Sequence, residues 1–187
     1  NNQIFNNTSI LNKILGYMLC FVFFSQVNAR CNGFNWYHDI DIKSCSKTDI
    51  EVLNTFIENS QKTINYDMDI DFNGLIDPLE LGWQLWEDGR LVHLICSDVP
   101  NPYFIDNYSC GLSGNLPYNI TNLDMLIKLH LDNNFLDGKI PDSFCNMADI
   151  LFDSYWLRIE DNHFCPPYPL CIDGIIGYQS YQKCQDK

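Results

Sequence analysis

A spacing of 24 residues recurs in the second half of the chain and constrains its fold more than any other feature. Leucines alternate in each copy, which predicts a short strand with one apolar face, and a Gly and a Pro then turn the chain. One such unit cannot bury its apolar face alone, so successive copies should stack in parallel. The matched pairs are Cys110 and Asn134, Leu112 and Leu136, Gly114 and Gly138, Leu116 and Ile140, and Pro117 and Pro141.

The fullest copy reads Leu126-x-x-Leu129-x-Leu131-x-x-Asn134-x-Leu136-x-Gly138-x-Ile140-Pro141. This pattern resembles the leucine-rich repeat, and its Leu-x-Gly-x-Ile-Pro part resembles the plant-type extracellular subclass. The resemblance covers about residues 91–164. It implies an α/β fold, a short leucine-rich repeat solenoid, in which the Asn side chain bonds the backbone of adjacent turns. Residues 30–90 would form a helical N-terminal cap, and residues 165–187 a disulfide-stapled C-terminal cap.

The two outer copies are less regular. The last one, Leu157-x-Ile159-x-x-Asn162, follows after 28 residues instead of 24. The first, residues 91–96, is followed late by Cys110, which predicts a surface insertion over residues 99–109 that a Cys96–Cys110 bond could close. Alternatively, Ile105 belongs to the strand and residues 91–96 are part of the cap, but the polar Asn107 would then occupy a core position.

The N-terminal segment has the three regions of a secretory signal peptide. Lys13 precedes an apolar run over residues 14–24, and Val27 and Ala29 suit a cleavage site after residue 29. The alternative is a transmembrane helix, but spanning a bilayer takes about 20 apolar residues. We therefore expect residues 1–29 to be removed and the remaining chain to be secreted, without insertion in a membrane.

Cysteine content agrees with an oxidising compartment. Eight cysteines remain after the predicted cleavage, an even number that suggests four disulfides with 105 possible pairings. No Cys-x-x-Cys pair occurs, which disfavours a zinc site. Two glycosylation sequons begin at Asn107 and Asn119. The disulfide candidates are Cys31, Cys45, Cys96, Cys110, Cys145, Cys165, Cys171 and Cys184.

A helix and a calcium-binding motif are predicted before the repeats. Residues 48–60 have helical apolar periodicity, and Thr48 with Glu51 would form a capping box. Residues 69–80 match D-x-[DN]-x-[DN]-G-x5-E and resemble an EF-hand loop, which implies a bound structural Ca²⁺. The alternative is an acidic turn without a cation. The implied ligands are Asp69, Asp71, Asn73, the Leu75 carbonyl, Asp77 through water, and Glu80.

A helix is also expected after this loop. Leu79, Trp83 and Trp86 lie at i, i+4 and i+7 and would form an apolar stripe that packs on the first repeat. A carbohydrate-stacking pair of tryptophans is the alternative.

Composition and motifs favour a binding protein over an enzyme. A net charge of −13 disfavours nucleic acid as a partner, and the sequence has no nucleophile elbow, zincin or P-loop motif. The histidines at 93, 130 and 163 read as surface residues. We expect a secreted, non-catalytic recognition protein for an extracellular protein or glycan. The alternatives are an inhibitor of a secreted carbohydrate-degrading enzyme or a secreted hydrolase.

The variable strand positions of the repeats are the predicted binding surface, because on a leucine-rich solenoid they point to the concave face. Tyr, Trp and Arg among them are types enriched at binding hot spots. Alternatively, Tyr155 and Trp156 pack under the C-terminal cap. The candidate partner-binding residues are Lys128, His130, Asp132, Tyr155, Trp156, Arg158 and Glu160.

Overall fold

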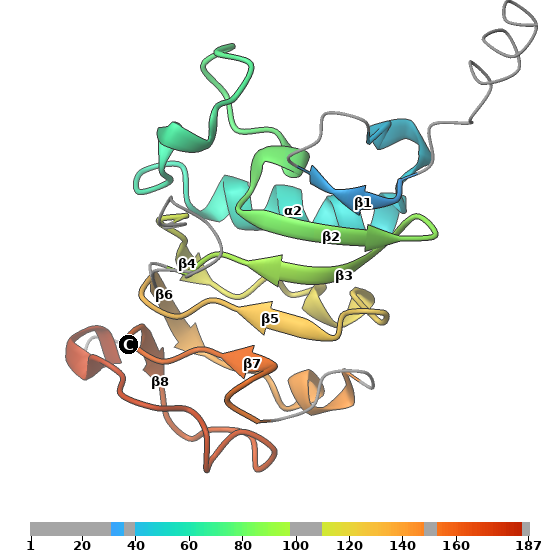
Figure 1. Cartoon of the computed structure of the whole chain (residues 1–187). Helices are drawn as coiled ribbons and strands as arrows, with labels where there is room; N and C mark the ends of the chain where they lie inside the picture. The colour runs from blue at the N-terminus through green and yellow to red at the C-terminus, as the bar shows by residue number, and fades with distance from the viewer. Residues whose placement is uncertain (1–30, 36–39, 98–109, 148–152, 185–187) are drawn as a thin grey trace, which may run out of the picture.

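The computed structural model describes residues 31–35, 40–97, 110–147 and 153–184. The predicted signal peptide, the insertion over residues 99–109 and the sequon at Asn107 lie outside these ranges. The described chain has one α-helix, α2 (Lys47–Asn59), and two β-sheets. In Figure 1, α2 lies behind β1 and β2, and the second sheet lies behind the first.

Five strands form a mixed sheet in the order β1-β2-β3-β5-β7, and three form a parallel sheet in the order β4-β6-β8. The strands of the mixed sheet are β1 (Gly33–Phe34), β2 (Trp83–Glu87), β3 (Arg90–Ile95), β5 (Lys128–His130) and β7 (Leu157–Arg158). The strands of the parallel sheet are β4 (Ser113–Asn115), β6 (Phe135–Lys139) and β8 (His163–Cys165).

The helix predicted before the repeats is confirmed as α2, but its cap is not the predicted one. Ser46 is the N-cap, and its Oγ accepts the Asp49 N–H at 3.4 Å, so the expected Thr48–Glu51 capping box is wrong. Val52, Leu53 and Phe56 are fully buried on one face of the helix. This face anchors α2 to the core behind the mixed sheet.

The helix expected after the acidic loop is wrong, because residues 83–95 form a β-hairpin. Asp88 and Gly89 have φ of 47° and 82°, the backbone that a tight hairpin turn needs, and Asp-Gly supplies it readily. Trp83 and Trp86 consequently point to opposite sides of β2. Trp86 is fully buried, whereas Trp83 is half-buried on the other side of the sheet.

The expected leucine-rich repeat solenoid is also wrong. The repeat strands do pair in parallel, β3 with β5 and β5 with β7, and Leu94, Leu129 and Leu157 are buried in register. However, the β2–β3 hairpin and β1 add antiparallel strands, so the larger sheet is mixed and the described chain forms no closed solenoid. The region expected to be a helical cap over residues 30–90 supplies two strands of that sheet.

Buried amides tie the successive copies of the repeat together. Asn134 Oδ1 accepts the Leu112 N–H at 2.8 Å, and Asn162 Oδ1 accepts the Leu136 N–H at 3.0 Å. Gln179 takes the same role one step later, where its Oε1 accepts the Phe164 N–H at 3.2 Å. Since all three amides are at most 3% exposed, each satisfies backbone groups that water cannot reach.

All eight candidate cysteines form disulfides: Cys31–Cys45, Cys96–Cys110, Cys145–Cys171 and Cys165–Cys184. The bond that could close the insertion, Cys96–Cys110, is therefore confirmed. Four disulfides in a short chain fit an extracellular protein. Within the described ranges, no helix is long and apolar enough to span a bilayer.

Candidate recognition face and acidic loop

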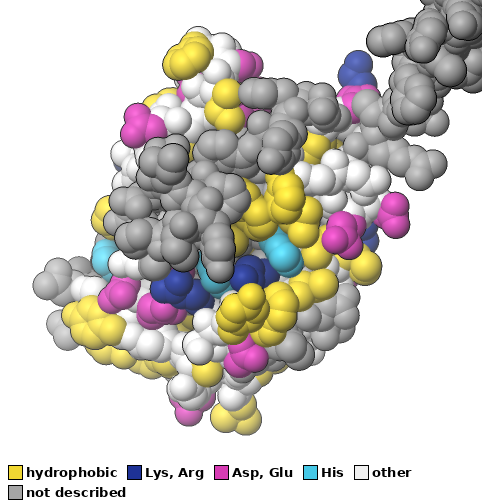
Figure 2. All heavy atoms as spheres, in the orientation of Figure 1, with side chains coloured by type: hydrophobic (Ala, Val, Ile, Leu, Met, Phe, Trp, Pro, Cys, Tyr) yellow, Lys and Arg dark blue, Asp and Glu magenta, His cyan; other side chains and the backbone are white. Residues whose placement is uncertain are grey.

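The exposed side of the mixed sheet, here called the outer face, collects most of the predicted partner-binding residues. Leu94, Leu129 and Leu157 point into the core, so the residues next to them in each strand point outward. This alternation aligns His93 with Lys128, and Ile95 with His130 and Arg158, in rows across the strands. In Figure 2, cationic and histidine side chains lie between two hydrophobic groups on this face.

Aromatic rings form one end of the outer face. The rings of Phe34 and Trp83 have centroids 4.9 Å apart, and Trp83 stacks on His93 at 5.9 Å with an interplanar angle of 27°. Phe34 comes from β1, Trp83 from β2 and His93 from β3, so three strands build one aromatic group. Offset rings of this kind give a rigid, largely apolar contact surface.

At the other end, Lys128 lies over two aromatic rings. Its Nζ is 4.3 Å from the centroid of the Tyr155 ring and 5.4 Å from that of Trp156, within cation–π range. Burial, and then the charge of Arg158, lower the pKa of Lys128 below its usual value. Among the described residues, no carboxylate oxygen lies within 4.0 Å of Nζ.

Arg158, in contrast, is held by two carboxylates of the same chain. Its Nη2 lies 2.9 Å from Asp132 Oδ2, and its Nε donates to Glu160 Oε1 at 3.2 Å. Asp132 is fully buried, and this burial raises the pKa of its carboxyl group against the opposing effect of Arg158. Its Oδ1 is buried and has no hydrogen-bond partner among the residues that the structure describes. Arg158 therefore serves largely to neutralise a buried acid.

Two histidines of the outer face are neutral at physiological pH. The pKa of His93 and that of His130 are both lowered to about 4, mainly by burial and in smaller part by the charge of the nearby Lys128, while the hydrogen bond to the Tyr155 carbonyl opposes the shift of His130. His130 Nε2 lies 3.0 Å from the Tyr155 carbonyl oxygen, which fixes its ring against the Tyr155 backbone.

The structure thus brings together the predicted residues Lys128, His130, Asp132, Tyr155, Trp156, Arg158 and Glu160. Tyr155 is 64% exposed, and neither it nor Trp156 belongs to the buried core, so the alternative position under a cap is wrong. Sequence analysis missed Phe34, Trp83 and His93 as members of this face. The signal for Trp83 was the Asp88-Gly89 pair, which marks a hairpin and reverses the predicted helical periodicity.

The acidic loop brings together three of the six predicted calcium ligands. One carboxylate oxygen each of Asp69, Asp71 and Glu80 lies within 4.8 Å of the other two. Asp77 is outside this group, and its backbone N–H donates to Glu80 Oε2 at 2.9 Å. Asn73 Oδ1 accepts the Leu75 N–H at 2.8 Å, so the Asn73 amide supports the turn.

Backbone donors hold the acids of this loop in place. Asp69 Oδ2 accepts the Gly74 N–H at 2.8 Å, and Glu80 Oε1 accepts the Ile70 N–H at 2.8 Å. Gly74 has a φ of 84°, the conformation that the sharp turn at this position of the motif requires.

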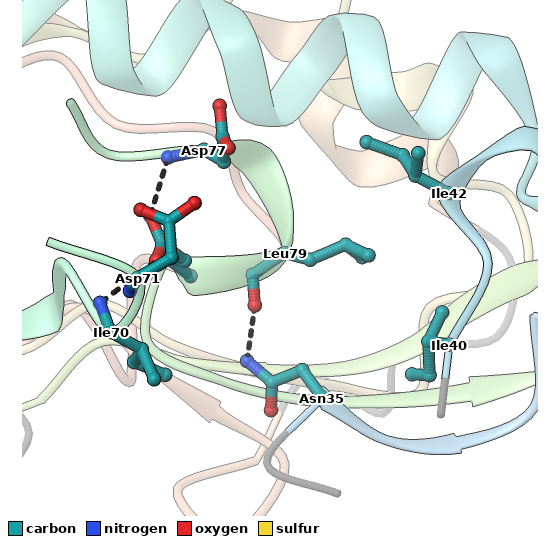
Figure 3. A pocket seen from close by; sticks show the side chains of 8 residues that line it. Asn35, Ile40, Ile42, Ile70, Asp71, Asp77 and Leu79 are labelled. Atoms are coloured by element: carbon teal, nitrogen blue, oxygen red, sulfur yellow. Dashed lines mark hydrogen bonds between the residues drawn. The ribbon is translucent and has the colours of Figure 1, made fainter. Parts of the chain in front are cut away.

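Beside the loop lies a cavity of about 250 Å³ that has Asp71, Asp77 and Ile70 on one side and Ile40 and Ile42 on the other (Figure 3). Leu79 O accepts a hydrogen bond from Asn35 Nδ2 at 2.8 Å at its back. The lining residues are Asn35, Ile40, Ile42, Ile70, Asp71, Asp77, Leu79 and Glu80.

The remaining described site candidate, the sequon residue Asn119, is 9% exposed and precedes the short 3₁₀ helix Ile120–Asn122. Within the described part of the chain, its buried Oδ1 has no hydrogen-bond partner.

Comparison of the sequence with known proteins identifies no family for this chain. The sequence matches no protein-family model and no curated protein.

Proposed function

We propose that this chain is a secreted, non-catalytic recognition protein that binds an extracellular protein or glycan through the outer face. The observation that carries the proposal is the row of aromatic, histidine and lysine side chains across four strands of the mixed sheet. Four disulfides and the predicted signal peptide support the extracellular setting. The 24-residue repeat supports kinship in sequence with leucine-rich repeat proteins.

The composition of the outer face suits binding. Trp, Tyr and Arg are over-represented among residues whose truncation weakens protein interfaces most. Trp83 and Trp156 lie at opposite ends of the face, and their rings are fixed by neighbouring side chains before a partner arrives. When a partner covers both ends, the side chains of the outer face would therefore lose little conformational entropy.

The test is binding of the oxidised full chain to panels of extracellular proteins and of glycans, followed by variants. Trp156→Ala should weaken any binding through the outer face at least tenfold, because hot-spot truncation costs about 2 kcal/mol. Tyr118→Ala is the matched control, since Tyr118 is 88% exposed and lies outside the mixed sheet. Equal affinities for Trp156→Ala and the unmodified chain would refute the outer face as the binding surface.

We also propose that the acidic loop binds a structural Ca²⁺. The convergence of Asp69, Asp71 and Glu80 and the positive φ of Gly74 support this, because Ca²⁺ prefers several oxygens in a sharply turned loop. Asn73, the Leu75 carbonyl and Asp77 would complete the shell if the loop tightens around the ion.

Thermal unfolding tests the calcium site. Lone extracellular sites bind at about 10⁻⁴ to 10⁻³ M, so a few millimolar Ca²⁺ should stabilise the chain by about 1 to 2 kcal/mol relative to chelator. Glu80→Gln should lose most of this gain, whereas Glu58→Gln, an exposed change on α2, should keep it. If all three proteins respond equally to Ca²⁺, the loop is an acidic turn and nothing more.

A further inference from the structure

We propose, building on the recognition role of the outer face, that Lys128 receives an Asp or Glu side chain of a protein partner. The partner would present this carboxylate between apolar side chains. The apolar side chains would lie on the aromatic groups at the two ends of the outer face.

Charge complementarity favours a carboxylate as the group that Lys128 receives. The chain carries 24 acidic and 11 basic side chains, and both arginines that the structure describes are paired with acids. Arg90 and Arg158 each pair with two. Lys128, like the other described lysines, has none within 4.0 Å among the described residues, but it lies in the middle of the outer face and over two aromatic rings. An incoming carboxylate would give this ammonium a counter-charge that none of the described residues supplies.

Desolvation also favours this pairing. Lys128 is half-buried, and two rings cover one side of its ammonium group. A cation that has already lost part of its water gains more from a carboxylate than a fully hydrated surface lysine does. The rings also keep the ammonium in one place, so the pair forms at little conformational cost.

The neighbours of Lys128 define what flanks the carboxylate. His93 lies beside it on β3, stacked on Trp83, and Trp156 lies beside it toward β7. His93 is neutral at physiological pH, so it does not compete for the anion. The other nearby cation, Arg158, is already paired with Asp132 and Glu160. The lysine is therefore an unpaired positive group, among the described residues, between apolar surfaces, and an acidic residue between apolar residues matches it.

The net charge of the whole molecule makes a selection of acidic peptides informative. A chain with a net charge of −13 attracts basic peptides through its overall field, so enrichment of acids can only come from a local site. The experiment is selection of a displayed library of random 12-residue peptides on the oxidised full chain. Peptides are kept for analysis if Trp156→Ala weakens their binding, which restricts them to the outer face.

The expected result is that these peptides carry Asp or Glu next to aromatic or aliphatic residues. Lys128→Glu should weaken their binding at least tenfold and should select basic residues instead. Lys139→Glu is the matched control, because it makes the same charge change at an exposed position of the other sheet and should leave binding within twofold. Near-ultraviolet circular dichroism and thiol counting show that each variant is folded and oxidised.

The contrary results separate the two proposals. Peptides that depend on Trp156 but lack acids, or that tolerate Lys128→Glu, overturn the carboxylate site and leave the recognition face standing. A polyuronate oligosaccharide that binds in a Lys128-dependent manner, where no peptide does, overturns the assignment to a protein partner. If every probe that binds does so equally well with Trp156→Ala, with Lys128→Glu and with the unmodified chain, the recognition face itself is overturned. The same holds if no probe binds at all.

Discussion

Asp49, the third residue of α2, holds the start of this helix against the start of β3. It is fully buried, receives the Arg90 guanidinium at 2.9 Å, and accepts the Leu91 N–H at 2.8 Å and the Ser46 hydroxyl at 3.0 Å. Asp49→Asn should destabilise the chain by about 2 to 4 kcal/mol, since it removes one partner of a buried ion pair. Urea unfolding of the oxidised protein measures this free energy.

Asp124 provides the control for that change. It also pairs with Arg90, but its side chain is 67% exposed, so Asp124→Asn should cost less than about 1 kcal/mol. Similar losses in the two variants would mean that burial of Asp49 is not what makes its ion pair important.

His93 and His130 should make the stability of the chain depend on pH. The pKa of each is about 4 when folded, against about 6.5 when unfolded, so the unfolded state binds more protons between these values. Stability should therefore fall as the pH is lowered from 6.5 to 4, by about 1 kcal/mol for each half-buried ring after solvent screening. Urea unfolding at pH 7 and pH 4.5 should show a smaller loss for the double variant His93→Gln, His130→Gln. Identical losses would contradict the prediction.

Among the elements, the amides that bridge successive repeat copies matter more than the strands, which are only two to six residues long. Asn162→Ala would remove the side-chain acceptor of the buried Leu136 N–H, at a cost of about 1 to 3 kcal/mol, whereas the Leu131 carbonyl would keep its hydrogen bond from Asn134 Nδ2. Hydrogen exchange at the Leu136 amide should accelerate in this variant. In Asn146→Ala, an exposed control, it should stay as in the unmodified chain.

The same elements show where sequence analysis succeeds and fails. Short strands in the repeat and the Asn134 and Asn162 amides are predictable, because alternation and a fixed offset encode them locally. Gln179 is not, because it follows Asn162 by 17 residues and belongs to no repeat. The helix predicted after the acidic loop is wrong, because Leu79, Trp83 and Trp86 fit a helical period. The Asp88-Gly89 turn, which makes residues 83–95 a hairpin, lies beyond them in the sequence. The antiparallel pairing of β1 and β2 with the sheet depends on packing between distant segments, and the repeat pattern carries no information about it.

For the whole molecule, the disulfides should contribute a large share of stability. A closed loop of about 15 residues stabilises by about 3 kcal/mol through the unfolded chain. Replacing Cys96 and Cys110 together by Ser should lower the free energy of unfolding by about this amount, because the two cysteines that close the loop are 14 residues apart in the sequence. Thermal unfolding of the purified double variant tests this, and an unchanged midpoint would contradict it. The content of cysteine predicts that such bonds exist, but only the folded chain chooses among the 105 pairings.

The order of the disulfides along the chain has a consequence for biogenesis. Cys31–Cys45 and Cys96–Cys110 each join neighbouring cysteines, so both can close as soon as their own segment reaches an oxidising lumen. Cys145–Cys171 and Cys165–Cys184 interleave, and the nearest thiols in that region, Cys165 and Cys171, are not partners. Oxidation by proximity alone would trap a short Cys165–Cys171 loop that thiol exchange must undo. The C-terminal quarter of this chain is consequently where a disulfide isomerase would determine the yield of native molecules.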